Sequence, residues 1–190
     1  MLKKVRNNVL SLSFVTAASV LGITFSASAA QGTIIGKVSS VDETSGVIMM
    51  LKDNVQVDAH KAKIRVKGVK GATIADIADG DMIEVQGSNN SSGIIKAKRI
   101  KAPVKLSGYD GKITGTTENV NTSSKTFGIF GQDVNASGLS GVCMSTKTIS
   151  FTRMVAGVNV EVYVTAQSSG LYCQALVISA SSCTHCHGSR

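Results

Sequence analysis

Aromatic side chains are scarce in this chain of 190 residues, which holds no Trp, three Tyr and five Phe. None of them lies between residues 31 and 102. Proteins that bind single-stranded nucleic acid stack the bases on aromatic rings, so this scarcity argues against nucleic acid as a partner. We expect the basic stripe of Lys96, Lys98, Arg99 and Lys101 to be a solvated strand face that discourages edge pairing instead.

The residue patterns of hydrolases and nucleotide-binding enzymes are also absent. The sequence has no G-x-S-x-G elbow and no phosphate-binding glycine loop placed between a strand and a helix. Histidine is limited to His60, His185 and His187. We therefore expect a protein that is not an enzyme.

The first 30 residues have the order of a secretory signal peptide. Three cations precede an apolar run over 9–25, and small residues follow at 26–30. The run is interrupted by Ser and Thr and is shorter than the about 20 apolar residues of a membrane anchor, and no later stretch has that length. We expect cleavage after Ala29 or Ala30 and a periplasmic or extracellular protein. Its removal lowers the net charge from +8 to +5, because it holds three of the 20 Lys and Arg and none of the 12 Asp and Glu.

The mature chain contains an imperfect internal repeat with an offset of 75 to 78 residues. Its landmarks match Gly36, Lys37 and Val38 with Gly111, Lys112 and Ile113, then Gly80, Glu84 and Val85 with Gly157, Glu161 and Val162, and finally Gly93 and Ala97 with Gly170 and Ala175. Each copy is expected to be one structural unit. Because Pro103, the only proline, interrupts the pattern, we divide the chain into a first unit (31–102), a second unit (103–180) and a tail (181–190).

Within each unit the apolar residues alternate with a period of two between frequent turn residues, which is typical of short antiparallel strands. We expect strands at 32–42, 47–51, 54–58, 63–66, 82–87 and 94–101 in the first unit, with a hairpin turn at 42–46 and a helical turn at 72–78. In the second unit we expect strands at 107–119, 126–129, 148–152, 158–166 and 171–179. The sequence therefore predicts an all-β protein of two tandem small OB-like β-barrels.

Three segments of the first unit carry a resemblance to a known family. They read GKVSSVDETSGVIMM, ATIADIADGDMIEVQG and GIIKAKRIK, and they include Gly36, Gly80, Asp81, Glu84, Val85, Gly87 and Ala97. Through them, residues 32–101 resemble the bacterial domain of unknown function DUF5666, an exported OB-like barrel that often occurs in tandem. The second unit is less similar, because Val158 stands where the family has Asp after glycine. The resemblance implies a fold and an extracytoplasmic location, but no activity.

Two of the four cysteines, Cys143 and Cys173, belong to the second unit. One lies shortly before the third expected strand and the other lies in the last strand, and these strands would be neighbours in an OB-like barrel. We therefore predict a Cys143–Cys173 disulfide, which would stabilise the unit by about 3–4 kcal/mol. Buried free thiols or a ligand role are the alternatives.

The other two cysteines lie in the tail and form the pattern C-x-x-C-H, which attaches c-type haem. We expect Cys183 and Cys186 to form the two thioethers to one haem and His187 to be the proximal ligand of its iron. The candidate distal ligand is His60, Met154 or a residue of a neighbouring subunit. Only three residues follow His187, so the haem would have to dock on its own barrel or on another molecule.

The sequence thus predicts an exported monohaem protein with haem c as its cofactor, which transfers or relays electrons in the cell envelope or outside the cell. Its expected partner is a redox protein or a neighbouring subunit of a homo-oligomer. Two alternatives for the tail remain open: a disulfide or redox-active thiol pair, and a zinc or copper site made by Cys183, Cys186 and one or both tail histidines. In either case the protein would be a non-enzymatic binding or structural module of the envelope.

Overall fold

The computed structural model describes residues 30–139, 141–144 and 147–178, and this part of the chain is built from β-strands with two short 3₁₀ turns. The first half contains β1 (Gln31–Asp42), β2 (Val47–Met50), β3 (Val55–Asp58), β4 (Lys63–Val66), η1 (Ile74–Asp76), β5 (Met82–Asn89) and β6 (Ile95–Ala102). The second half contains β7 (Gly111–Asn121), β8 (Thr126–Ile129), β9 (Gln132–Asn135), β10 (Val142–Met144), β11 (Lys147–Ile149), η2 (Phe151–Arg153), β12 (Asn159–Gln167) and β13 (Gly170–Ile178). None of the described segments forms a helix of the length and apolar character that crossing a membrane requires.

Five strands of the first half close into a barrel. The pairing runs from β1 to β2, β3, β6 and β5 and returns to β1, and the β3–β6 contact is parallel while the others are antiparallel. Since alternate residues of a strand face the barrel interior, one side chain in two is buried. The fully buried aliphatic residues are Ile34, Ile48, Met50, Val55, Val57, Ile83, Val85, Ile95 and Ile100. β4 lies outside this ring and pairs in parallel with β6.

The strands of the second half repeat this order of pairing. β7 pairs with β8, β8 with β9, β9 in parallel with β13, β13 with β12, and β12 with β7. β10 pairs in parallel with β13, as β4 does with β6. Two phenylalanines fill this interior, because the rings of Phe127 and Phe151 are both buried and their centroids are 6.1 Å apart.

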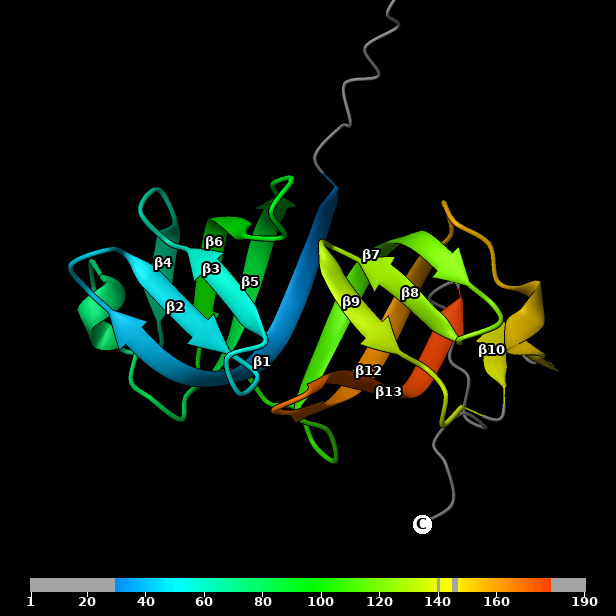
Figure 1. Ribbon diagram of the computed structural model, residues 1–190. Helices are drawn as coiled ribbons and strands as arrows, with labels where there is room; N and C mark the ends of the chain where they lie inside the picture. Colours follow the sequence, from blue (N-terminus) through cyan, green and yellow to red (C-terminus); the bar gives the residue numbers. More distant parts are fainter. Residues whose placement is uncertain (1–29, 140, 145–146, 179–190) are drawn as a thin grey trace, which may run out of the picture.

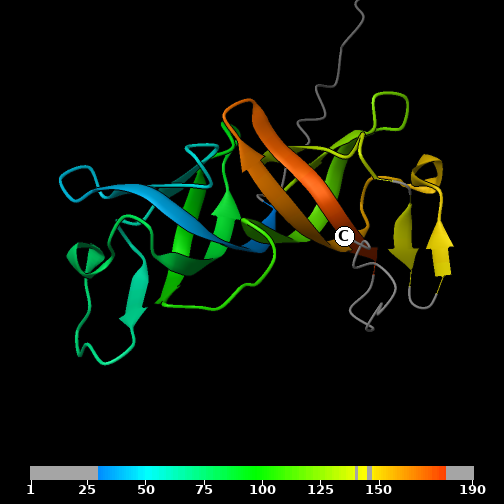
Figure 2. The ribbon, with the colours of Figure 1, turned by 90° about the horizontal axis from the view of Figure 1, so that it is seen from below.

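β1 and β7 join the two halves into one continuous sheet. Figure 1 shows the blue β1 alongside the green β7 at the centre of the molecule, and Figure 2 shows the same two lobes from below. The two strands are antiparallel and place Gly36 opposite Gly111. These two glycines are equivalent positions of the internal repeat, so the two halves are related by a local twofold arrangement at this pair.

Glycines let two large side chains enter this seam between the halves. A Cβ at Gly36 would lie 2.7 Å from Leu51 Cδ2, and one at Gly111 would lie 2.8 Å from the same atom. A Cβ at Gly32 would lie 2.8 Å from Phe130 Cγ. Leu51 and Phe130 directly follow β2 and β8, and both are buried. The seam is therefore close-packed, and any side chain larger than hydrogen at these glycines would displace its neighbours.

The turn between β1 and β2, predicted at residues 42–46, is held by one carboxylate. Asp42 accepts hydrogen bonds from the backbone N–H groups of Thr44 and Ser45 and from the Ser45 hydroxyl, at 2.6–3.1 Å. These bonds, led by the one from the Ser45 hydroxyl, lower the pKa of Asp42 because they favour its charged form. Gly46 then closes the turn with a positive φ of 60°.

The structure confirms the mostly β fold and several of its predicted elements. The strands at 63–66 and 126–129 have the predicted bounds, and η1 lies inside the predicted helical turn. The predicted strand at 148–152 is wrong in its second half, where Ser150 caps η2 by accepting a hydrogen bond from the Thr152 N–H. Two strands, β9 and β10, are not predicted, because they are short and β9 alternates exposed with buried residues over only four positions.

The basic stripe on β6 is a solvated strand face, as predicted, because its four cations are all exposed. Its predicted role in discouraging edge pairing is wrong. β6 pairs with β3, β4 and β5, so it is an interior strand and has no edge to protect. The periodicity of the sequence does not show that β4 pairs along one edge of β6, and this pairing is what makes β6 an interior strand.

Candidate functional site

The three predicted haem-attachment residues, Cys183, Cys186 and His187, lie outside the described residues. The described chain ends with β13 at Ile178. Among the residues that the structure does describe, no group of three His, Cys, Asp or Glu side chains is arranged to hold a metal ion.

The predicted disulfide between Cys143 and Cys173 is not formed in the structure, where Cys173 is a buried free thiol. β10 and β13 are neighbours, as expected, but their register places Cys143 opposite Val177. Cys173 precedes Val177 by four residues along β13, which is about 13 Å of extended strand. A disulfide spans roughly 4.4–6.8 Å between Cα atoms, so this register separates the two cysteines too far.

The thiol of Cys173 lies in an apolar environment that makes it weakly reactive. Its Sγ donates a hydrogen bond of 3.4 Å to the Ala175 carbonyl. Burial raises the pKa of the Cys173 thiol to about 12, because the interior disfavours the thiolate. The protonated thiol is a poor nucleophile and a poor metal ligand, so this cysteine is a core residue.

His60, one candidate distal ligand, takes part in the turn that follows β3. Its Nδ1 lies 3.0 Å from Asp58 Oδ1, and its backbone N–H donates to the same oxygen. The ring packs on Gly46, where a Cβ would lie 2.8 Å from Nδ1. These bonds from His60 lower the pKa of Asp58. One ring nitrogen of His60 is therefore paired with a carboxylate, while the side chain remains 59 % exposed.

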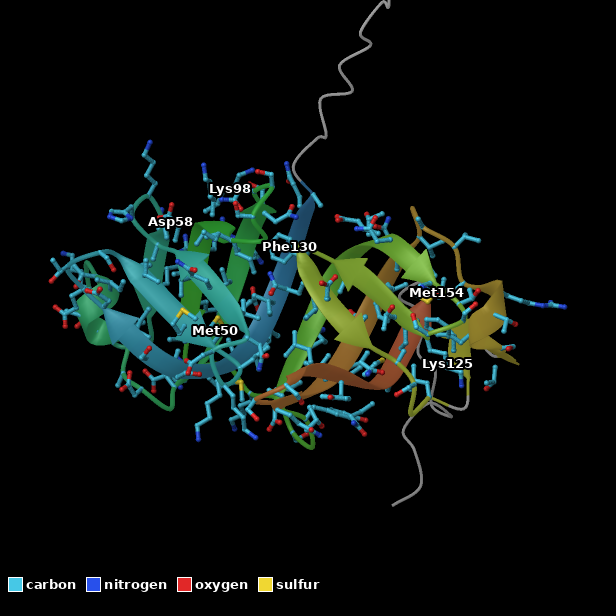
Figure 3. All side chains as sticks on the ribbon, in the orientation of Figure 1. Met50, Asp58, Lys98, Lys125, Phe130 and Met154 are labelled. Atoms are coloured by element: carbon cyan, nitrogen blue, oxygen red, sulfur yellow. The ribbon has the colours of Figure 1, made fainter. Side chains whose placement is uncertain are left out.

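Met154, the other candidate distal ligand, follows η2 and is 3 % exposed. Its backbone N–H donates to the Phe151 carbonyl at 2.9 Å. Figure 3 shows Met154 in the second lobe, whereas Asp58, the partner of His60, lies in the first lobe. Because its thioether is enclosed, ligation of a haem on the surface would require the core to open there.

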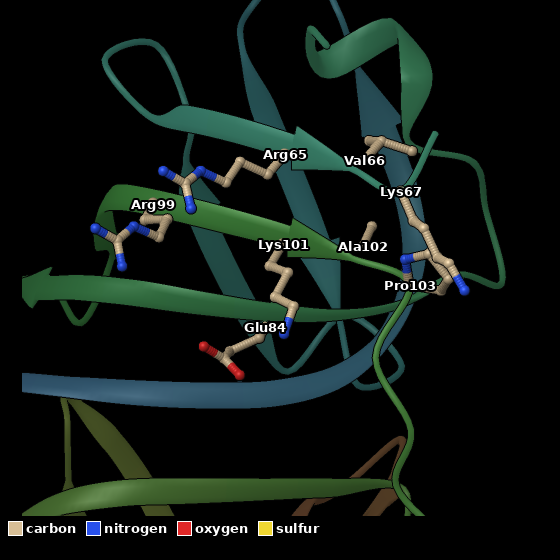
Figure 4. Close-up of a pocket in the computed structure, with 8 residues that line it drawn as sticks. All are labelled: Arg65, Val66, Lys67, Glu84, Arg99, Lys101, Ala102 and Pro103. Atoms are coloured by element: carbon tan, nitrogen blue, oxygen red, sulfur yellow. The ribbon is translucent and has the colours of Figure 1, made fainter. Parts of the chain in front are cut away.

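A cationic face on the first half is the most distinctive surface of the described chain. Two adjoining hollows of about 410 Å³ and about 560 Å³ lie over β4, β5 and β6, and they share Arg99. Their cationic lining residues are Lys63, Arg65, Lys67, Lys98, Arg99 and Lys101, and all six are exposed. Figure 4 shows Arg65, Arg99 and Lys101 side by side on β4 and β6, near Glu84 on β5. We call these six residues the cationic face.

Strand register brings the cationic face together. The parallel pairing of β4 and β6 places Lys63 opposite Arg99 and Arg65 opposite Lys101. A bulge in β6, where its pairing with β5 shifts register, makes Lys98 and Arg99 both face outward although they are consecutive. The basic residues of β6 are visible in the sequence, but sequence reasoning missed those of β4. Cations alternate with apolar residues over 63–67, which indicates a strand with one basic face. This pattern points to the cationic face only when β4 is known to lie beside β6.

Acidic partners are almost absent from this face. Glu84 is the one carboxylate among the residues that line the two hollows, and its Oε1 accepts a hydrogen bond of 2.9 Å from Gln86 Nε2. In the part of the chain that the structure describes, neither of the two ion pairs involves the cationic face. In the second half, by contrast, Lys112 Nζ lies 3.3 Å from Glu161 Oε1.

Comparison with known proteins gives no family for this chain. No family model matches it, and neither a curated protein nor a solved structure matches it. The resemblance to the DUF5666 domain stays a prediction.

Proposed function

We propose that this chain is an exported, non-enzymatic protein of two OB-like barrels that carries a haem c on its C-terminal tail and transfers electrons. The observation that carries the proposal is the C-x-x-C-H pattern of the tail in a chain that begins with a signal-like segment. Haem attachment of this type occurs outside the cytoplasm, so the two sequence features agree with each other.

The OB-like description is supported by the order of strand pairing. In each half a long first strand pairs with the second and fourth strands of a five-strand ring, and the third and fifth strands meet in parallel. A five-stranded barrel of this size is typical of the OB-fold. The joined halves would act as a rigid carrier for the tail.

In this proposal Cys183 and Cys186 bind the haem covalently and His187 ligates its iron. The haem supplies a one-electron redox couple when bound. Met154 is enclosed in the core, whereas the contact of His60 Nδ1 with Asp58 leaves Nε2 able to ligate a metal. We therefore propose that the distal ligand is His60 or comes from a neighbouring subunit or a redox partner, and is not Met154.

The deciding experiment uses the full chain, secreted from a host with a c-type haem maturation system. We expect an added mass of one haem and a sharp reduced α-band, and we expect both to be lost in the Cys183→Ala/Cys186→Ala variant. Met154→Leu should leave the reduced spectrum unchanged, whereas a changed spectrum in His60→Ala would identify His60 as the distal ligand. A colourless chain whose tail cysteines form a disulfide, or which instead binds zinc or copper, would contradict the proposal.

A further inference from the structure

We propose that the cationic face binds a linear acidic polysaccharide. This inference goes beyond electron transfer and does not depend on the tail. The six cations and the single carboxylate Glu84 give the face a net charge of +5. The chain from residue 31 onward has the same net charge of +5, since it holds 17 Lys and Arg and 12 Asp and Glu. Elsewhere the charges balance, so the basic surplus is concentrated on this face.

The fold explains only part of this concentration of charge. Lysines on edge strands prevent aggregation, which accounts for the cations of β4, because β4 ends the order of strands. β6 is an interior strand, so Arg99 and Lys101 need another reason. Like charges placed directly opposite each other destabilise a sheet, and the register produces two such pairs, Lys63 with Arg99 and Arg65 with Lys101. A bound polyanion would relieve this repulsion.

The geometry of the face fits a chain with regularly placed anionic groups. Alternate residues along a strand are about 6.4–6.8 Å apart, and neighbouring strands are about 4.8 Å apart. Arg65 and Arg99 can each bind a carboxylate or sulfate through two N–H groups. The second hollow is also lined by Gln31, Thr33 and Gln86. Their amide and hydroxyl groups can form hydrogen bonds with sugar hydroxyls, which favours a polysaccharide over a simple inorganic anion.

Two other anionic partners fit less well. A single-stranded nucleic acid would need stacking platforms, and residues 31–102 hold no aromatic side chain. A membrane surface would need apolar residues that insert between the lipids. In the described chain the large exposed hydrophobic residues are Val69 and Val155, and only Val69 lies close to the face in sequence. The observations therefore favour the polysaccharide.

The test measures binding of the full secreted chain by calorimetry. The probes are polygalacturonate for carboxylates, dextran sulfate for sulfates, and unmodified dextran as the neutral control. We expect binding to at least one of the charged polymers and none to dextran. Raising NaCl from about 50 mM to about 200 mM should weaken that binding by roughly tenfold or more, because ionic contacts release counterions.

Matched variants place the binding on the face. Arg65→Gln/Arg99→Gln/Lys101→Gln should weaken binding by roughly tenfold or more. Lys61→Gln/Lys105→Gln/Arg153→Gln removes the same charge from exposed residues elsewhere and should change it by less than about threefold. Glu84→Gln, which removes the carboxylate of the face, should tighten binding by about twofold or more, a gain that a misfolded variant would not give.

Several outcomes would overturn the proposal. They are equal loss of binding in both triple variants, absence of binding to either charged polymer, and tighter binding to a poly-dT oligonucleotide or to vesicles of phosphatidylglycerol than to the polysaccharides. Failure to incorporate haem would leave this result unaffected, because the binding assay does not use the tail.

Discussion

Adding a single methyl group at Gly36 should loosen the seam that joins the two halves. Its Cβ would lie 2.7 Å from Leu51 Cδ2, whereas ordinary van der Waals contact begins at 3.4 Å. Leu51 is 1 % exposed and cannot move away freely. Overpacking of this kind costs about 1–3 kcal/mol. Replacing glycine by alanine in a strand recovers about 0.5–1 kcal/mol of backbone entropy, so we expect Gly36→Ala to lower the free energy of unfolding by about 1–2 kcal/mol.

A double-mutant cycle tests whether Leu51 is the cause. Leu51→Ala alone should cost about 2.7–5 kcal/mol, because it leaves a cavity at the seam. In Gly36→Ala/Leu51→Ala the new methyl group enters that cavity, so the clash disappears. We expect the double variant to be at least as stable as Leu51→Ala, which gives a coupling energy of about 1 kcal/mol or more.

Urea denaturation followed by circular dichroism measures these differences. The control is Gly138→Ala, because a Cβ at Gly138 would meet no atom within 4 Å and its φ is not positive. This variant should be neutral or slightly stabilised. The reasoning is refuted if Gly36→Ala behaves like Gly138→Ala, or if the two seam substitutions add without coupling.

The remaining expectations concern the seam as a whole and two ionisable groups. Because β1 pairs with β7, both halves should unfold in one cooperative transition, and separate transitions in calorimetry would contradict this. Burial raises the pKa of the Cys173 thiol to about 12, so at pH 8 it should react with iodoacetamide roughly a thousandfold more slowly in the native protein than in the unreduced, denatured chain, as followed by mass spectrometry. No reaction after denaturation would reveal a disulfide. Since this folded-state pKa lies above the ordinary thiol value of 9.0, the stabilisation is complete below pH 9 and is lost as the pH rises towards 12. Urea midpoints of the wild type and of Cys173→Ala can follow this loss. For Asp58, whose pKa is lowered by hydrogen bonds from His60, the stabilisation is present above the ordinary carboxyl value of 3.8 and is lost as the pH falls below it. An NMR titration should show the pKa of Asp58 return towards that value in His60→Ala.

The two proposals describe different parts of one molecule. The tail would carry the electron through haem, and the cationic face would hold the protein against an acidic polymer. The seam matters for both, because it keeps the second half, which bears the tail, fixed relative to the first half, which bears the face. Gly36→Ala should therefore leave binding to the polymer unchanged while lowering stability, and it separates the role of the seam from that of the face.

Local patterns were sufficient for much of the secondary structure. The alternation of Ile64 and Val66 with cations identified β4, and Asp42 with Gly46 identified the first hairpin turn. These signals are local, because strand periodicity and turn chemistry depend on residues only a few positions apart. The internal repeat was also visible in the sequence, and in the structure the order of strand pairing of the first half occurs again in the second.

Long-range pairing decided the rest. The sequence shows glycines at 32, 36, 111 and 115, but only the fold shows that Leu51 and Phe130, which follow β2 and β8, pack on them. The sequence also shows four cysteines, but only the register of β10 against β13 places Cys143 opposite Val177 and leaves Cys173 as a buried thiol. The cationic face likewise requires β4 beside β6. The physical reason is the same in each case: a one-residue change of register would turn every side chain of a strand to the other face, and register is determined by contacts between residues far apart in the chain.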